Sequence, residues 1–235
     1  SVGKSSLARS IATRVARDGS AVLILSQEMP QDEQADCVLA ELGRIDSQRL
    51  QNGQMADEDW GRLADAADVA KELPLHIDEQ GNLSLMDIRS KARSVKGLRL
   101  LVVDYLQLCK STLKGKTTND EIAELSKGLK ALALELGIPI LVLSQLNRDV
   151  EKRADKEPQL ADLRDSGAIE QDLDIALLMW TVEERDDSRI VGIKVAKHRG
   201  GRTGRLAMRF DAPVYGWTDC DFPTRAPQSA ARRGI

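Results

Sequence analysis

Short apolar segments alternate along the chain with longer segments in which apolar residues recur every three or four positions. Nearly continuous apolar runs of this length are typical of parallel strands that are covered on both faces. We therefore expect five strands in one mostly parallel sheet. The expected strands are Ala21–Leu25, Leu75–Ile77, Arg99–Val103, Ile138–Leu143 and Ile175–Trp180.

Helical periodicity fills the segments between these strands, and several of the helical segments end at glycine or just before proline. The expected helices are Ser5–Asp18, Gln31–Leu42, Asp57–Glu72, Leu85–Val95 and Asn119–Leu136. Strands that alternate with helices predict an α/β fold with a doubly wound sheet flanked by helices. In such sheets ligands bind at the carboxyl ends of the strands.

The segment Arg189–Phe210 departs from this alternation, because its apolar residues occupy every second position on two arms around His198–Gly204. This pattern predicts a C-terminal β-hairpin. Basic residues, including Lys197 and Arg199, gather at its tip. A guanidinium there could stabilise the charge on a phosphoryl group held by a neighbouring subunit. The alternative is a basic hairpin that binds phosphate backbones or protects a sheet edge.

Composition limits the class of protein without deciding its function. With 235 residues, of which 42% are hydrophobic and 30% charged, the chain can form one globular α/β domain. The net charge is −3, so any contact with nucleic acid must come from local basic patches. The three cysteines lack metal or redox spacing, and no segment approaches the length of a membrane span. The cytoplasm is therefore the expected compartment.

The first candidate binding motif lies at the start of the chain, where Ser1–Ser6 matches the second half of the phosphate-binding motif G-x-x-x-x-G-K-[S/T]. Gly3 lets the backbone approach a polyphosphate closely, and the N–H groups of the helix start, through Ser6, face the anion. Lys4 supplies a positive charge for the β and γ phosphates, and Ser5 a hydroxyl ligand for Mg²⁺. ATP and Mg²⁺ are the expected ligands, and the alternative is a chance Gly-Lys-Ser at a helix start.

The first glycine of this motif and the strand that leads into it would precede Ser1. In this fold that strand lies inside the sheet, so its removal would expose unpaired backbone groups. We therefore expect these 235 residues alone to fold poorly or to aggregate, and to be inactive.

Three polar residues follow expected strands and are candidates for the same site. Glu28 could act as the general base that orients a water, or it could simply favour the next helix start through the helix dipole. Asp104 ends an apolar strand in the Walker B pattern, so its carboxylate could hold Mg²⁺ opposite Ser5. Gln145 could sense the γ phosphate and relay hydrolysis to the loop that follows, or could be a polar strand end.

Five strings together resemble the C-terminal, RecA-like motor domain of DnaB-type replicative DNA helicases, over residues 1–217. They are Ser26–Met29, Val102–Leu108, Ser144–Arg148, Asp162–Asp172 and Lys197–Gly204. The resemblance implies a RecA-like P-loop NTPase domain that ends near Trp217. The remaining residues, Thr218–Ile235, lack periodicity and are expected to be a disordered tail.

The resemblance also implies a function and a role for each site residue. It implies a homo-hexameric ring that hydrolyses ATP with Mg²⁺ between subunits and translocates along single-stranded DNA during replication. Such a protein works in the cytoplasm at the nucleoid, with a helicase loader and a primase. The implied roles are a catalytic base for Glu28, a γ-phosphate sensor for Gln145, reach into the neighbour's triphosphate site for Lys197 and Arg199, and DNA contact for Arg164, Asp165 and Gly167.

One departure and two alternatives accompany this interpretation. The family usually has an arginine in the helix after the Glu-Met pair, whereas Asp36–Leu42 contains none, so no role of that arginine can be transferred. A RecA- or RadA-type recombination ATPase would form filaments instead of rings. A nucleotide-binding module without motor activity would not depend on Glu28.

Overall fold

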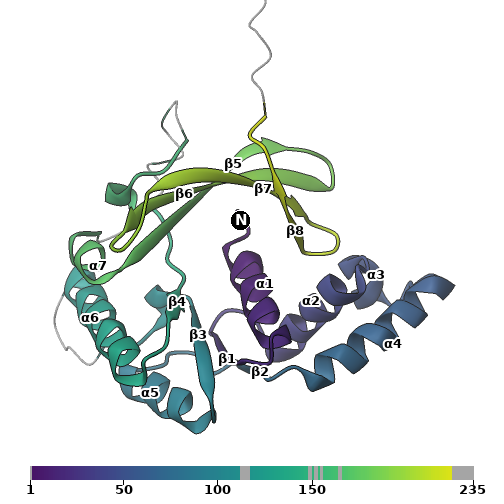
Figure 1. Cartoon of the computed structure of the whole chain (residues 1–235), viewed down its shortest axis with the longest axis horizontal. Coiled ribbons are helices and arrows are strands. Elements are labelled where there is room, and N and C mark those ends of the chain that lie inside the picture. The colour runs from purple at the N-terminus through teal and green to yellow at the C-terminus, as the bar shows by residue number, and fades with distance from the viewer. Residues whose placement is uncertain are drawn as a thin grey trace, which may run out of the picture.

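The computed structural model describes residues 2–111, 117–147, 150, 153, 156–163 and 166–223. These residues form two four-stranded sheets, with helices packed against the first sheet and the second sheet arching over it (Figure 1). The strand order is β2-β1-β3-β4 in the first sheet and β5-β6-β7-β8 in the second.

The first sheet is parallel throughout its described pairs. In this sheet Ser26 of β1 pairs with Asp104 of β3, so the carboxyl ends of these two strands lie side by side. The fourth strand pairs with β3 up to Val142 and ends at the same edge. The strands are β1 (Ala21–Ser26), β2 (Leu75–Asp78), β3 (Leu98–Asp104) and β4 (Ile140–Val142).

Helices cover both faces of this sheet because alternate side chains of each strand point to opposite sides. Leu23 and Leu25 pack in a core with residues of α5 and α6, whereas Val22 and Ile24 pack against α1. The helices are α1 (Lys4–Arg17), α2 (Gln31–Gly43), α3 (Ser47–Asn52), α4 (Asp57–Glu72), α5 (Leu85–Ser94), α6 (Thr118–Leu136) and α7 (Ser166–Asp172), with short 3₁₀ turns η1 (Leu106–Leu108) and η3 (Leu160–Asp162).

The second sheet is antiparallel. Its inner face carries an apolar cluster that includes Val191, Phe210 and Trp217, and this cluster packs against Val2 and Leu7 beside the start of α1. The second sheet thereby lies next to the candidate phosphate-binding loop. Its strands are β5 (Ile175–Glu184), β6 (Ser188–His198), β7 (Gly204–Asp211) and β8 (Gly216–Cys220).

The expected α/β architecture, a helix-flanked parallel sheet followed by a C-terminal hairpin, is confirmed. One expectation is wrong: Ile175–Trp180 belongs to β5, which pairs antiparallel with β6 instead of joining the parallel sheet. An apolar run does not encode strand direction, and Ile175 and Leu177 are in fact exposed.

Strand β8 runs to Cys220, past the expected boundary at Trp217. Residues 224–235 lie outside the described part of the chain, so the disordered tail stays a prediction.

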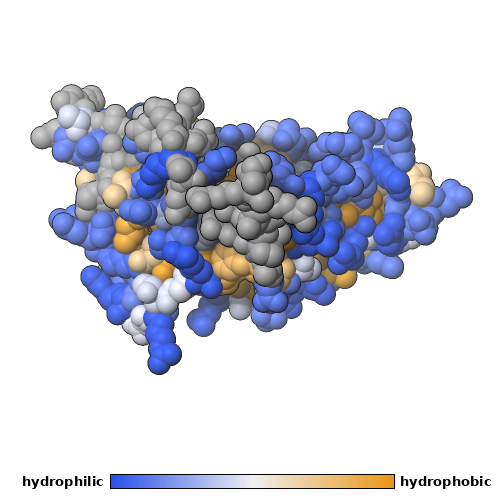
Figure 2. All heavy atoms as spheres, turned by 90° about the horizontal axis from the view of Figure 1, so that it is seen from above, coloured by the Kyte–Doolittle hydropathy of each residue, from blue (hydrophilic) through white to orange (hydrophobic). Residues whose placement is uncertain are grey.

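The surface seen from above is mostly hydrophilic, with apolar patches beside the segments drawn in grey (Figure 2). Of the exposed large apolar side chains, Ile175, Leu177 and Val182 lie on β5 and Leu206 lies on β7. Among the helices of the described ranges, none is both long enough and apolar enough to cross a membrane.

Candidate nucleotide-binding site

The phosphate-binding loop passes directly into α1. Gly3 precedes the helix with φ of 98°, a left-handed conformation that favours glycine. No side chain caps this helix start, and no acidic residue lies in its first turn. The N–H groups at the start of α1, from Lys4 onward, are therefore suited to an anion.

A tryptophan from the second sheet covers this loop. Trp217 of β8 donates a hydrogen bond from Nε1 to Ser6 Oγ at 3.1 Å. A Cβ atom added to Gly3 would lie 3.0 Å from the Trp217 ring, so this close approach also favours glycine. The sequence pattern did not identify Trp217, because nothing in its neighbourhood relates it to a motif at the other end of the chain.

The expected metal-site residues lie together. Asp104, at the end of β3, is buried and accepts a hydrogen bond from the side chain of Ser5 in α1. Burial raises the pKa of the Asp104 carboxyl, and the negative charge of Glu28 raises this pKa further. The Ser5 hydrogen bond and the positive charge of Lys4 act in the opposite direction. Lys4, Ser5 and Glu28 thus all lie close enough to Asp104 to change its pKa, although the four residues come from three separate motifs.

The oxygen ligands of this site, from Ser5 and Asp104, suit Mg²⁺ and a bound nucleoside triphosphate. Mg²⁺ takes few protein oxygens and completes its shell with water and phosphate oxygens, which matches the Asp104 carboxylate and Ser5 hydroxyl. In the described ranges, no group of three or more His, Cys, Asp or Glu residues could hold a metal ion. The Asp104 carboxylate and the Ser5 hydroxyl could hold Mg²⁺ together with phosphate oxygens of a bound nucleotide.

Buried hydrogen bonds fix the turn that carries Glu28. Ser26 Oγ donates to the Met29 carbonyl at 2.7 Å, which closes the turn around Glu28. Gln34 Nε2 donates to Ser26 Oγ at 3.0 Å, and Arg9 Nη1 donates to Gln34 Oε1 at 3.0 Å. The side chains of Arg9, Ser26 and Gln34 are all buried. This chain links the helix of the phosphate-binding loop to the turn of the candidate base.

Arg9 itself was not singled out in the sequence. Its guanidinium lies 4.9 Å from the centroid of the Tyr215 ring, in the turn between β7 and β8. The pKa of Cys37 on α2 is raised by burial, and the charge of Arg9 acts against this shift. An arginine in an amphipathic helix usually indicates the solvent face, so sequence periodicity could not identify it as a buried contact.

Gln145 lies beyond the carboxyl end of β4, at the edge of the sheet where Asp104 ends β3. The register continues past the strand, since the Leu143 N–H donates to the Val103 carbonyl at 3.0 Å. Gln107 Nε2 then donates to Ser144 Oγ at 2.8 Å. Gln145 itself is exposed. The structure thus puts Gln145 at the expected edge, where its role as a sensor stays a prediction.

Lys197 and Arg199 lie at the tip of the β6–β7 hairpin, close to α7 (Figure 1). Lys197 Nζ donates to the Glu170 carbonyl, and the Arg199 guanidinium lies 3.4 Å from the Asp174 carboxylate. Hydrogen bonding to Lys130 is the main cause that lowers the pKa of Asp174. The contacts described for the two hairpin residues are therefore with α7 and the start of β5.

The expected DNA-binding residues are only partly described. Gly167 lies in the first turn of α7. Arg164 and Asp165 lie outside the described residues, so the structure neither places them nor tests their role.

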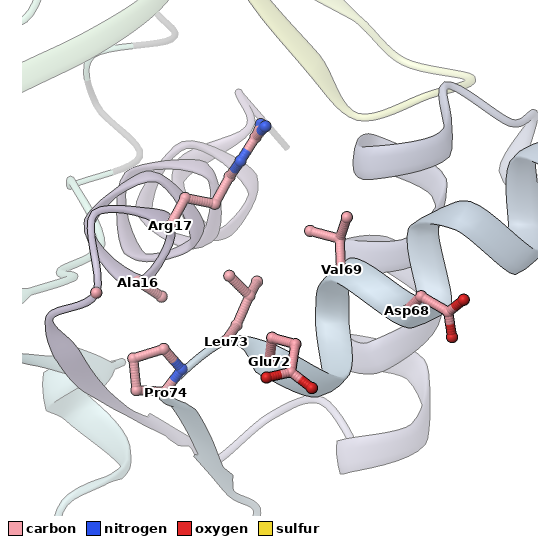
Figure 3. A pocket seen from close by; sticks show the side chains of 8 residues that line it. Ala16, Arg17, Asp68, Val69, Glu72, Leu73 and Pro74 are labelled. Carbon is pink, nitrogen blue, oxygen red and sulfur yellow. The ribbon is translucent and has the colours of Figure 1, made fainter.

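A shallow pocket of about 440 Å³ lies at the opposite end of α1 (Figure 3). Arg17 and Leu73 are among its lining residues, and the C-terminal ends of α1 and α4 form its walls. Because α1 starts at the phosphate-binding loop and ends at this pocket, the pocket is separate from the candidate nucleotide site.

Comparison with known proteins adds family information to this geometry. Residues 1–219 match the family model for the DnaB-like helicase C terminal domain. The chain is 38% identical over 219 residues to the replicative DNA helicase DnaB of Geobacillus stearothermophilus, covering 89% of this chain and 48% of that protein. It is 44% identical over 190 residues to DnaB of Mycobacterium intracellulare, covering 78% of this chain and 33% of that protein. The chain therefore spans less than half of the length of these relatives.

Two solved structures are also similar, each with a TM-score of 0.89 and 31% identity over 94% of this chain. One is a DnaB-like replicative helicase studied with its interactions with primase, of which 55% is covered. The other is an ATPase domain, of which 82% is covered.

Proposed function

Since this chain belongs to the DnaB-like helicase C-terminal domain family, we propose that it is the motor of an ATP-dependent replicative DNA helicase. The complete protein would form a homo-hexameric ring that translocates on single-stranded DNA and displaces the other strand. The observation that best supports this function is the contact of Asp104 with Ser5, in the electrostatic environment shared with Lys4 and Glu28. A motor needs such a site to couple hydrolysis to movement.

The phosphate-binding loop and β3 would hold the nucleotide. The N–H groups that follow Gly3, from Lys4 to Ser6, face the position of the β and γ phosphates. Lys4 adds charge there, while Ser5 and Asp104 hold Mg²⁺. ATP would supply the γ-phosphoryl group, and Mg²⁺ held by Ser5 and Asp104 would neutralise the charge that develops on it.

Glu28 and Gln145 would act on the attacking water and on the product state. Glu28 orients the water and accepts its proton, and the hydrogen bonds of Ser26 hold the backbone of its turn in place. Gln145 donates an amide hydrogen bond to the γ phosphate. Gln145 also begins the segment that leads to α7. Loss of the hydrogen bond after hydrolysis would therefore change the conformation of this segment.

Lys197 and Arg199 would serve the nucleotide of the neighbouring subunit. The Arg199 side chain is 63% exposed and its carboxylate partner is exposed as well, so the guanidinium is accessible to another subunit. A cation delivered across the interface stabilises the charge of the transferring phosphoryl group and makes hydrolysis depend on ring assembly.

Arg164, Asp165 and Gly167 would line the ring channel and contact DNA phosphates. Backbone and arginine contacts with phosphates carry little sequence information, as translocation requires. A helicase loader and a primase would bind the complete protein, which we propose acts in the cytoplasm at the nucleoid.

The comparisons do not favour the two alternatives drawn from the sequence. The curated relatives named above are replicative helicases, not strand-exchange ATPases. The match of residues 1–219 to a helicase family model does not favour a module without motor activity. We therefore retain the helicase motor as the single proposal.

The deciding experiment is Glu28→Gln in the full-length protein. Single-stranded DNA should stimulate ATP hydrolysis by the unmodified protein, and the substitution should lower kcat by about 10²–10⁴-fold because the amide cannot accept the proton. Nucleotide binding should persist, since the phosphate contacts remain.

Glu33→Gln, further along the chain and exposed on α2, is the matched control and should keep full hydrolysis. The proposal is wrong if Glu28→Gln hydrolyses ATP at the normal rate, or if duplex unwinding does not depend on hydrolysis.

A further inference from the structure

In the described part of the segment between Gln145 and α7, the Glu157 carboxylate lies against the basic hairpin. Glu157 Oε1 lies 2.8 Å from Lys194 Nζ on β6 and 2.8 Å from Arg205 Nη2 on β7. The Glu157 side chain is only 13% exposed, although it comes from a segment outside the second sheet. One acidic group thus joins both arms of the hairpin.

The register of the hairpin explains why this carboxylate matters. Lys194 and Arg205 are directly opposite each other in the antiparallel ladder. Like charges at opposite positions on neighbouring strands repel and destabilise the pair. Glu157 lies against both cations and converts a repulsive cross-strand pair into a three-residue ionic cluster. The geometry of the two arms at this level therefore depends on where Glu157 is held.

The same segment is attached at its other side to the strand end that carries Gln145. Leu146 forms an antiparallel bridge with Leu163, and the Asn147 N–H donates to the Asp162 carbonyl at 2.8 Å. Leu163 is buried in the core shared by the first sheet and α6. The backbone beyond Gln145 is thereby fixed to the stretch that presents Glu157.

The hairpin tip lies a short distance beyond the ionic cluster. Along the chain, Lys197 lies three residues and Arg199 five residues after Lys194, at the end of β6 and just beyond it. We infer that Glu157 is a positioning residue that fixes the direction in which the hairpin presents Lys197 and Arg199 to a neighbouring subunit. Displacement of the segment after Gln145 then shifts this pair through Glu157. This inference rests on the proposed action of the pair across the subunit interface.

The test measures DNA-stimulated ATP hydrolysis by the assembled full-length protein. Glu157→Gln removes the charge that compensates the two cations and should lower kcat about five- to tenfold, a coupling effect of ordinary size. The KM for ATP should stay within about twofold, because the phosphate-binding loop of the same subunit is unchanged. Glu184→Gln, at the exposed end of β5, is the matched control and should leave both constants unchanged.

A charge-reversed variant separates positioning from general destabilisation. The triple variant Glu157→Lys/Lys194→Glu/Arg205→Glu rebuilds both ion pairs with opposite signs and should recover at least about half of the original kcat, as expected for a coupled network. Failure to recover activity, with rings assembled and melting temperature preserved, overturns the inference. So does full activity of Glu157→Gln.

Arg199→Ala distinguishes this inference from the function on which it rests. This variant should lose at least about a hundredfold in kcat if its guanidinium acts on the neighbour's nucleotide. Normal activity of Arg199→Ala would reject the action across the interface itself. Loss of activity in Arg199→Ala together with an unaffected Glu157→Gln would reject only the positioning role of Glu157.

Discussion

At the scale of single residues, the interface between α1 and α2 contains a carboxyl group whose ionisation opposes folding. Ser10 Oγ donates to Glu41 Oε1 at 2.5 Å, while Glu41 Oε2 is buried without a hydrogen-bond partner in the described structure. Burial raises the pKa of Glu41, against the lowering effect of the Ser10 hydrogen bond and of three nearby arginines. Desolvation of the carboxylate therefore outweighs its favourable contacts.

Replacing Glu41 by glutamine should stabilise the protein at neutral pH. A carboxyl with a raised pKa in the folded state contributes stability at low pH that is lost as the pH rises through the folded pKa. Glu41→Gln keeps an acceptor for Ser10 and removes the ionisation cost. The melting temperature without nucleotide should rise by a few degrees at about pH 7.5, and the gain should shrink toward about pH 5.

Glu58→Gln on the exposed start of α4 controls for the loss of one negative charge and should show no such pH-dependent gain. Equal or lower stability of Glu41→Gln at neutral pH would mean that attraction to the arginines exceeds the desolvation cost.

The same scale shows which parts of the site the sequence can reveal. Lys4, Glu28 and Asp104 each follow a glycine of a known motif or an apolar strand, so their position relative to a strand end can be predicted. Arg9 and Gln34 lie inside helices, where polar residues normally face solvent. Only the packing of α1 against α2 shows that they are buried behind the turn of Glu28.

At the scale of elements, the second sheet depends on a glycine that admits an aromatic ring. Gly192 of β6 pairs with Trp180 of β5, and a Cβ atom at Gly192 would lie 2.3 Å from the indole. Gly192→Ala should therefore lower the free energy of unfolding by about 1–3 kcal/mol, because the rigid ring must move. Urea unfolding of the full-length protein measures this change.

Gly61→Ala on α4 is a control with the opposite expected sign, since no atom lies within 4 Å of its added Cβ. This alanine should stabilise the helix by up to about 1 kcal/mol. A neutral Gly192→Ala would show that the indole can shift without loss of packing.

Elements also differ in how well their sequence predicts them. The helices Asp57–Glu72 and Gln31–Gly43 show long periodic patterns with clear ends, and both were expected nearly as they are. Strand β5 was expected, but its antiparallel pairing with β6 was not, since pairing direction depends on the chain that returns beside it. The six-residue α3 is too short to show helical periodicity.

At the scale of the whole molecule, the two sheets meet at the phosphate-binding loop through Trp217. The second sheet therefore does more than carry the basic hairpin, because its last strand braces the loop that would hold the phosphates. Trp217→Phe keeps an aromatic ring against Gly3 but removes the N–H donor to Ser6. Loss of one hydrogen bond of ordinary strength should raise the KM for ATP about two- to tenfold.

The rate at saturating ATP should change little in Trp217→Phe, because Glu28 and the hydrogen bond that closes its turn are untouched. Trp180→Phe, in the same sheet but stacked on Phe222, should leave the KM unchanged and so controls for loosening of the sheet. Steady-state hydrolysis with DNA in excess measures both constants. A fall in kcat at constant KM would contradict the bracing of the loop, and would show instead that Trp217 acts on the hydrolytic step.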